Sequence, residues 1–183
     1  MVIENERCRI EITVDTTYTV DSADNRYYDV VLNPCQYGRS DVSKTFSIHI
    51  DLAYKELRLA LIGPFYSYNS DCAVLDDETL TVLQDNSITQ VRITDGSILQ
   101  HKTFECFGCN FAIYRVAKGY VIYGEMEITM LDFSFEKMWS FSGKDIFVSV
   151  SDKQPFRISG NTICLYDFDG NYYELDLDGN RIR

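Results

Sequence analysis

The sequence predicts an all-β protein, and three observations support this prediction. Apolar and polar residues alternate with a period of two over most of the chain, as in strands that bury one face. Turn-forming pairs such as Asp-Gly and Lys-Gly separate these segments. After residue 72 the pattern of strands and turns also recurs about every 40 residues, a period typical of repeat architectures.

The first part of the chain, residues 7–68, predicts one irregular sheet. Candidate strands lie at 7–14, 26–32, 45–52 and 56–62. The last of these is contested, because Asp51 could cap a helix and Gly63 with Pro64 could end it. The residues Leu57, Leu59 and Leu61 alternate with other residues, however, which favours a strand.

Residues 72–104, 111–142 and 146–183 predict three repeated sheets. The segment ITQVRITDGSI (88–98) aligns with ITMLDFSFEKM (128–138) and with YYELDLDGNRI (172–182). A matching pair of strands precedes each segment, in AVLDDETLTVL, AIYRVAKGYVI and FRISGNTICLY. Each unit is therefore expected to be a four-stranded meander, with strands at 72–76, 79–84, 88–94, 97–104, 111–117, 120–125, 127–133, 137–142, 146–151, 155–159, 162–168 and 171–177 and a short return at 180–183.

The C-terminal LYDFDGNYYELDLDGNRIR contains Asp-Gly-Asn twice. A calcium loop needs a glycine at its sixth position and a glutamate at its twelfth, and neither copy has them. Asp-Gly instead suits the centre of a type I′ hairpin turn. Such turns would pair Tyr166 with Tyr173, Cys164 with Leu175, and Asp176 with Arg181, and would place Cys164 and Tyr166 on the buried face.

The three aligned units resemble the blades of β-propeller repeat proteins, which are four-stranded sheets packed around a channel. The resemblance covers residues 72–183 and lacks the Trp-Asp and Gly-His signatures of the best-known blade family. It implies a small propeller-like domain of about four blades spanning residues 1–183, with 7–68 as a divergent first blade. A three-blade fragment beside a separate N-terminal sheet and a β-sandwich remain alternatives.

Charge limits the classes of partner. The chain has 28 acidic and 17 basic residues, and its formal net charge is −11. Such a field repels phosphate backbones, so we expect no nucleic-acid binding, and it favours a basic protein partner. No apolar stretch approaches the ~20 residues of a membrane helix, and no secretory signal is apparent in MVIENERCRIEITV. A cytoplasmic location with reduced thiols is the expectation.

Chemistry-bearing motifs are sparse. Cys106 and Cys109 form the one close cysteine pair, and His101 could add a third ligand to a zinc site. A zinc site usually needs four ligands, so the pattern is incomplete. The sequence has no Gly-rich phosphate loop, zinc-protease motif or kinase signature. We therefore expect no cofactor and assign no catalytic residue.

Surface tyrosines and acids provide the candidate partner-binding residues. Tyr66 and Tyr68 lie in the expected loop PFYSYNSD, and Asp76, Asp77 and Glu78 form an acidic turn. Tyrosine buries a large area at low entropic cost, and acids would attract a basic partner. The leading hypothesis is a noncatalytic binding module of the adaptor or immunity type. The alternatives are a carbohydrate-binding or hydrolytic domain that uses carboxylates and tyrosines, and a structural subunit that self-assembles.

Overall fold

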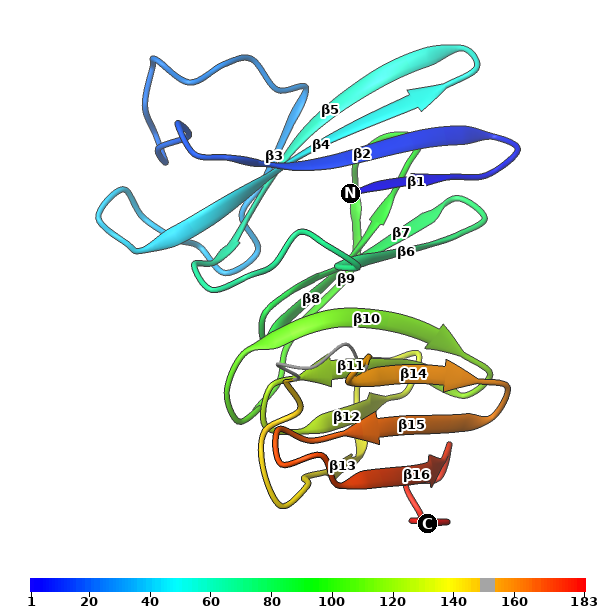
Figure 1. Ribbon diagram of the computed structural model, residues 1–183. Coiled ribbons are helices and arrows are strands. Elements are labelled where there is room, and N and C mark those ends of the chain that lie inside the picture. Colours follow the sequence, from blue (N-terminus) through cyan, green and yellow to red (C-terminus); the bar gives the residue numbers. More distant parts are fainter. Residues whose placement is uncertain (149–153) are drawn as a thin grey trace. The chain divides into compact units, whose positions relative to one another are not determined.

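The computed structural model describes residues 1–148 and 154–183, and the regular elements among them are all strands (Figure 1). The predicted all-β class is confirmed. The chain divides into two compact units of two sheets each, Met1–Thr103 (unit 1) and Phe104–Arg183 (unit 2). Within the described ranges no helix is long and apolar enough to span a membrane.

The N-terminal sheet of unit 1 has five strands. Their order across the sheet is β1 (Val2–Glu4), β2 (Cys8–Asp15), β4 (Ser43–Leu52), β5 (Lys55–Pro64) and β3 (Val30–Leu32). The strands from β1 to β5 pair antiparallel with their neighbours, and the edge strand β3 runs parallel to β5. The sequence predicts no strand at β1.

The contested segment is strand β5. It pairs with β4 from Ser43↔Pro64 to Leu52↔Lys55, so ten consecutive backbone positions are matched in register. Leu57, Leu59 and Leu61 all point into the apolar core. Long-range pairing and burial of the alternating leucines therefore outweigh the local helix-capping signals.

The strand predicted at 26–32 shrinks to Val30–Leu32. Arg26 Nε donates to Tyr28 Oη at 2.7 Å, and Tyr28 Oη donates to the buried carboxylate of Asp15 at 2.7 Å. These side-chain bonds tie Arg26 and Tyr28 to Asp15 at the end of β2, and the ladder with β5 begins only at Val30. Tertiary hydrogen bonding thus overrides the β propensity of RYYDVV.

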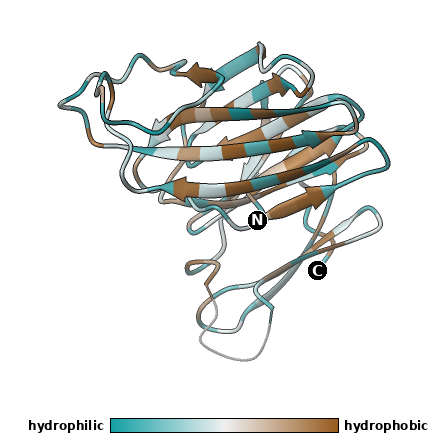
Figure 2. Cartoon of the chain, turned by 90° about the horizontal axis from the view of Figure 1, so that it is seen from above, coloured by the Kyte–Doolittle hydropathy of each residue, from teal (hydrophilic) through white to brown (hydrophobic). Residues whose placement is uncertain are grey.

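The second sheet of unit 1 is a meander that packs on the first. Its order is β6 (Ala73–Asp76), β7 (Thr79–Gln84), β8 (Ser87–Arg92) and β9 (Ile98–Thr103). Side chains from both sheets form one core, and hydrophobic and hydrophilic residues alternate along the long strands (Figure 2). Its fully buried members include Ile10, Ile48, Leu59, Leu80 and Val91.

Unit 2 repeats the arrangement with a smaller second sheet. The first sheet is the predicted meander β10 (Asn110–Val116), β11 (Gly119–Gly124), β12 (Ile128–Leu131) and β13 (Lys137–Phe141). The second has three strands, β14 (Phe156–Ser159), β15 (Thr162–Tyr166) and β16 (Tyr172–Asp176), and the two sheets share a core.

One predicted strand of the third repeat is wrong where it can be compared with the structure. Residues 146–148 of the strand predicted at 146–151 are not in a strand, and the remainder lies outside the described residues. Phe147 is buried, and its backbone N–H donates to the Glu125 carbonyl at 2.7 Å. The short return predicted at 180–183 is present beside β16, where Ile182 N–H donates to the Glu174 carbonyl at 2.7 Å and Arg181 forms a bridge with Leu175.

The type I′ turns predicted for the two Asp-Gly pairs are also wrong. Gly170 and Gly179 have φ of 81° and 80°, but the preceding aspartates are not among the positive-φ residues. Asp167 and Asp176 instead accept the backbone N–H of the asparagine four residues later, each at 2.8 Å. This longer turn moves the register by one residue, so Tyr166 faces Tyr172. Ile163 and Leu165, not Tyr166, therefore enter the core, because a one-residue slip exchanges the faces of a strand.

The second and third aligned repeats share this turn. Asp132 Oδ1 accepts from the backbone N–H of Ser134 and Glu136, as Asp176 Oδ1 does from Asp178 and Asn180. Phe135 (φ 62°) and Gly179 (φ 80°) occupy matching positions with left-handed backbone. The aspartates of these repeats act as turn residues that cap backbone donors.

Candidate functional site

Three hairpin turns of unit 1 meet at one end of its sheets. Cys8 at the start of β2 pairs with Leu52 at the end of β4, which sets the β1–β2 turn and the β4–β5 turn side by side. The third turn joins β6 to β7, and Asn5 Nδ2 donates to its Asp77 carbonyl at 3.5 Å. Strand β8 ends at the same place, where Ile93 N–H donates to the Glu78 carbonyl at 3.0 Å.

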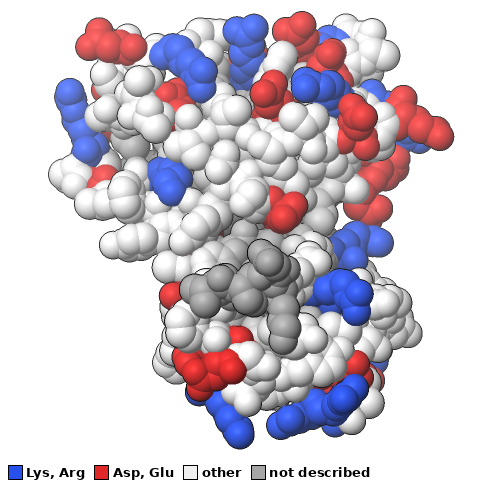
Figure 3. Space-filling view, viewed as in Figure 1, with Lys and Arg blue, Asp and Glu red and all other residues white. Residues whose placement is uncertain are grey.

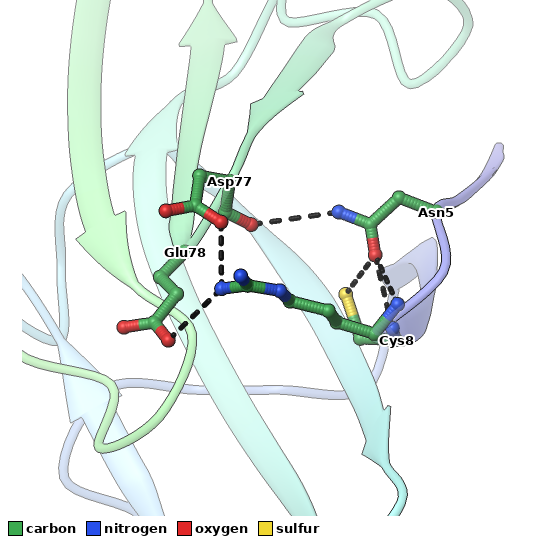
Figure 4. Close-up of polar contacts among 5 residues, drawn as sticks. Asn5, Cys8, Asp77 and Glu78 are labelled. Carbon is green, nitrogen blue, oxygen red and sulfur yellow. Dashed lines mark hydrogen bonds and ion pairs between the residues drawn. The ribbon is translucent and has the colours of Figure 1, made fainter.

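Two of the predicted acids are engaged by one arginine. The carboxylates of Asp77 and Glu78 both turn toward the guanidinium of Arg7, with N···O distances of 2.7 and 3.4 Å (Figure 4). All three side chains are more than half exposed. Exposed pairs of this kind contribute only about 0–1 kcal/mol each, so a competing ligand could displace Arg7 at small cost.

A groove of about 390 Å³ lies among these turns. Leu52 and Ile93 are buried at its base, whereas the side chain of Tyr54 is 72% exposed. The groove thus combines an apolar floor, an exposed aromatic ring and a charged rim. Its lining residues are Glu6, Arg7, Leu52, Ala53, Tyr54, Glu78, Ile93 and Thr94.

The rim of the groove is acidic. The turn segments 4–7, 51–56 and 76–78 contain seven acidic residues and two basic ones, Arg7 and Lys55. In Figure 3 acidic side chains gather at the right-hand edge of unit 1, where Figure 1 shows the β1–β2 and β6–β7 turns. A concentrated negative field at a groove favours cationic ligands and speeds their association.

The structure separates the predicted partner-binding residues. Glu78 lines the groove, and Asp77 beside it pairs with Arg7, another lining residue, whereas Asp76 is the last residue of β6. Tyr66 and Tyr68 precede β6 in the loop after Pro64, at the opposite end of that strand, although both are exposed. The acidic half of the prediction therefore reaches the groove through Glu78 and through the Asp77–Arg7 pair, and the aromatic half does not.

Sequence reasoning missed Tyr54, the aromatic residue of the groove. It sits in the two-residue connection Ala53-Tyr54 between β4 and β5. The strands predicted at 45–52 and 56–62 leave Tyr54 between them, so pairing these two strands as a hairpin would have placed Tyr54 in the exposed turn. The approach of Arg7 to Asp77 spans 70 residues and has no local signal.

The three candidate zinc ligands belong to different units, His101 to unit 1 and Cys106 and Cys109 to unit 2. His101 Nε2 lies 3.5 Å from Cys35 Sγ, and its Nδ1 lies 3.0 Å from Thr89 Oγ1. Cys106 Sγ donates to the Gly108 carbonyl at 3.7 Å. Across the described residues, no three His, Cys, Asp or Glu side chains form a group that could hold a metal ion.

A second groove, of about 370 Å³, lies on the N-terminal sheet. Its cations are already paired: Arg26 Nε lies 2.8 Å from Asp15, and Arg58 lies 3.9 Å from Glu56. Burial acts to raise the pKa of Asp15, but hydrogen bonds from Tyr28 and Thr17 and the charge of Arg26 bring that pKa below its ordinary value. Its lining residues are Glu11, Thr13, Arg26, Tyr27, Tyr28, Ser47, His49 and Arg58.

Comparison with known proteins identifies no family. No family model matches the sequence, and no curated protein matches it either. Among solved structures, the chain is similar to that of Kluyvelomyces marxianus Hsv2, with a TM-score of 0.47 and 6% identity. The match covers 76% of this chain and 44% of that one, so this chain spans less than half of the Hsv2 structure. Fold and site together define an all-β protein with an acidic, partly apolar groove.

Proposed function

We propose that the protein is a noncatalytic binding module whose unit 1 groove captures a basic segment of a protein partner. The observation that carries this proposal is the groove itself, which places the exposed ring of Tyr54 beside apolar Leu52 and Ile93 and beside acidic Glu6 and Glu78. Binding sites for proteins are typically centred on such an aromatic or aliphatic anchor with a polar rim.

The groove suggests how a basic segment would be held. An aliphatic or aromatic side chain of the partner would pack against Tyr54, Leu52 and Ile93 and would exclude water from them. Lysine or arginine residues on either side of that anchor would meet the carboxylates of Asp77 and Glu78, with Arg7 turning outward. The acids would chiefly raise the association rate, and the apolar contact would chiefly slow dissociation.

This role is compatible with an adaptor or immunity-type protein, which acts by occupying a partner's basic surface. The relationship to β-propeller proteins belongs to the same proposal, because a propeller would present hairpin turns like these at the rims of its blades. A cytoplasmic location remains part of the expectation.

Peptide binding tests the proposal directly. Fluorescein-labelled peptides of one length, each with one central leucine and with net charge from −4 to +6, would be titrated against the full chain by anisotropy. We expect affinity to rise with positive charge and to fall as salt increases from about 50 to 300 mM, because added salt screens exposed charges. Tyr54→Ser should weaken binding about tenfold or more, as loss of an anchor does.

Matched variants separate the groove from general surface effects. Tyr66→Ser removes a similarly exposed tyrosine, 67% against 72%, at the other end of β6 and should leave affinity unchanged. Arg7→Ala should tighten binding of the +6 peptide by a few fold, because it frees Asp77 and Glu78. Affinity that is independent of peptide charge, or equal losses in Tyr54→Ser and Tyr66→Ser, would overturn the proposal.

A carbohydrate-binding function is the second candidate, and the groove on the N-terminal sheet favours it. Tyr27 is 75% exposed there and lies with Glu11, His49 and Arg58 along the same groove. An exposed ring beside polar groups suits a sugar, whose faces are apolar and whose edges hydrogen-bond. A glycan array with Tyr27→Ala as control would test this function, and sedimentation velocity would test self-assembly separately.

A further inference from the structure

A cysteine, a histidine and a threonine from three separate elements meet in unit 1. Cys35 lies in the loop after β3, His101 in β9 and Thr89 in β8, where Thr89 and His101 are directly paired across the strands. Cys35 Sγ lies 3.5 Å from His101 Nε2, and His101 Nδ1 lies 3.0 Å from Thr89 Oγ1. A nucleophile, a base and a group that orients the base have this relation in nucleophilic enzymes.

The loop holds Cys35 in place. Asn33 Oδ1 accepts the Tyr37 N–H at 2.9 Å, and Asn33 Nδ2 donates to the Tyr37 carbonyl at 2.8 Å, which closes the turn that contains Cys35. The next residue, Gln36, has a left-handed φ of 58°. Such backbone strain is kept only where surrounding bonds fix it, so the thiol is held in position before any reagent arrives.

The environment of His101 suits a base. Burial lowers the pKa of His101, and a hydrogen bond to the Ile88 backbone partly opposes this effect. The imidazole is therefore neutral near pH 7. With the proton on Nδ1 and donated toward Thr89 Oγ1, Nε2 presents its lone pair to the Cys35 thiol. Thr89 is 1% exposed, so its hydroxyl is a fixed partner for the ring.

We propose that Cys35 is a reactive thiol, activated by His101, that takes up low-molecular-weight disulfides by thiol–disulfide exchange. His101 Nε2 takes the proton from Sγ, and the thiolate attacks one sulfur of the disulfide RS–SR. The Cys35–S–S–R bond forms as the RS–SR bond breaks, and the departing RS⁻ takes the proton back from His101. One RSH is released, and the protein carries a mixed disulfide. Attack by a second thiol reverses the step.

Other groups near the pair must be considered in its pH dependence. Burial raises the pKa of Tyr37, and negative charge on Cys35, Asp41 and Asp85 raises it further, so Tyr37 and these two aspartates are titratable groups near the loop of Cys35. Ser87 Oγ lies 4.0 Å from Cys35 Sγ and adds a neutral hydroxyl. His101, whose Nε2 lies 3.5 Å from Cys35 Sγ, is the base in contact with the thiol and would assist loss of its proton.

The remaining cysteines provide internal controls. Burial raises the pKa of the Cys72 thiol to about 12 and that of Cys8 above its ordinary value, and both side chains are buried. Cys164 is buried as well, whereas Cys106 and Cys109 are half-buried like Cys35. The Cys106/Cys109 pair is therefore the matched comparison for Cys35.

The test is the rate of reaction with 4,4′-dithiodipyridine, followed by absorbance on the reduced, folded full chain from pH 5 to 9. Peptide mapping by mass spectrometry assigns the first label. We expect Cys35 to react first at pH 7, and oxidised glutathione to label the same residue. In His101→Gln the Cys35 rate at pH 7 should fall at least about tenfold, since general bases contribute factors of this size or larger.

Two further variants and a pH profile of the unmodified chain separate activation by His101 from a general change in the fold. Cys106→Ser/Cys109→Ser should retain the fast phase, and Thr89→Val should slow it less than His101→Gln does. In the unmodified chain the Cys35 rate should level off above the histidine titration, whereas a thiol without a base keeps rising toward pH 8.5. First labelling at Cys106 or Cys109, or a His101→Gln rate equal to that of the unmodified chain, would overturn the proposal.

Discussion

The two Asp-Gly turns of unit 2 are each capped by an aspartate, Asp167 in the first and Asp176 in the second. We expect the carboxylate of Asp167 to stabilise unit 2 more than that of Asp176. It is 2% exposed, and it accepts from the Asn171 backbone N–H at 2.8 Å, from Asn171 Nδ2 at 2.9 Å and from Tyr173 Oη at 2.7 Å. Tyr173 is itself 2% exposed. Removal of the carboxylate therefore leaves a buried hydroxyl short of its acceptor.

The size of the effect follows from these bonds. A hydrogen bond to a charged group contributes about 1.5–3 kcal/mol net, and bonds that share one acceptor are not additive. Asp167→Ala should therefore lower the free energy of unfolding by about 3 kcal/mol. Asp176→Ala is the control, because Asp176 makes the same turn with Asn180 but has no buried tyrosine partner, and its loss should be clearly smaller.

Urea unfolding followed by tryptophan fluorescence measures both variants. Trp139 is the single tryptophan, and its Nε1–H donates to the Leu177 carbonyl at 3.1 Å, so its emission reports on unit 2. Equal losses in Asp167→Ala and Asp176→Ala would refute the role assigned to burial and to Tyr173. A pH series gives a second check. Hydrogen bonds outweigh burial and lower the pKa of Asp167, so its stabilisation is present above about pH 4 and is lost as pH falls further. Asp167→Asn should remove that part of the acid dependence.

Two further predictions concern stability. Gly119→Ala should lower the stability of unit 2 by at least about 2 kcal/mol, because the added Cβ would overlap the Leu131 carbonyl at a φ of 149°. Gly160→Ala is the control: it has a φ of 58° and open space around it, so the loss should be only about 1 kcal/mol. Equal urea midpoints for the two variants would contradict this prediction. Burial raises the pKa of Tyr123 to about 12, so the folded state keeps the phenol proton that the unfolded state loses above about pH 10. Stability should therefore fall between those values, and a Tyr123→Phe chain with an unchanged alkaline slope would show that Tyr123 is not the cause.

Much of the strand arrangement could be predicted because a strand with one buried face shows itself in adjacent residues. Leu57, Leu59 and Leu61 illustrate this, since their alternation alone outweighed a plausible helix cap. The errors occurred where side-chain hydrogen bonds decide the backbone conformation of a turn. The Asp-Gly turns took a longer form because Asp167 and Asp176 cap the backbone, and the resulting slip exchanged Tyr166 for Leu165 in the core.

The candidate site was also only partly visible in the sequence. The acidity of Asp76, Asp77 and Glu78 is visible in the sequence, and so is the excess of negative charge that points to a basic partner. The ion pair from Arg7, the ring of Tyr54 and the floor formed by Ile93 come from three other segments of the chain.

By itself, the sequence determined the all-β class, most strand positions and the sign of the surface field, because each depends on local pattern or on composition. Only the tertiary structure decided which turns form the groove and that Cys35 meets His101, 66 residues away. The physical reason is that strand order and register set which loops converge. These depend on how whole sheets bury their faces against each other, and no short segment encodes that choice.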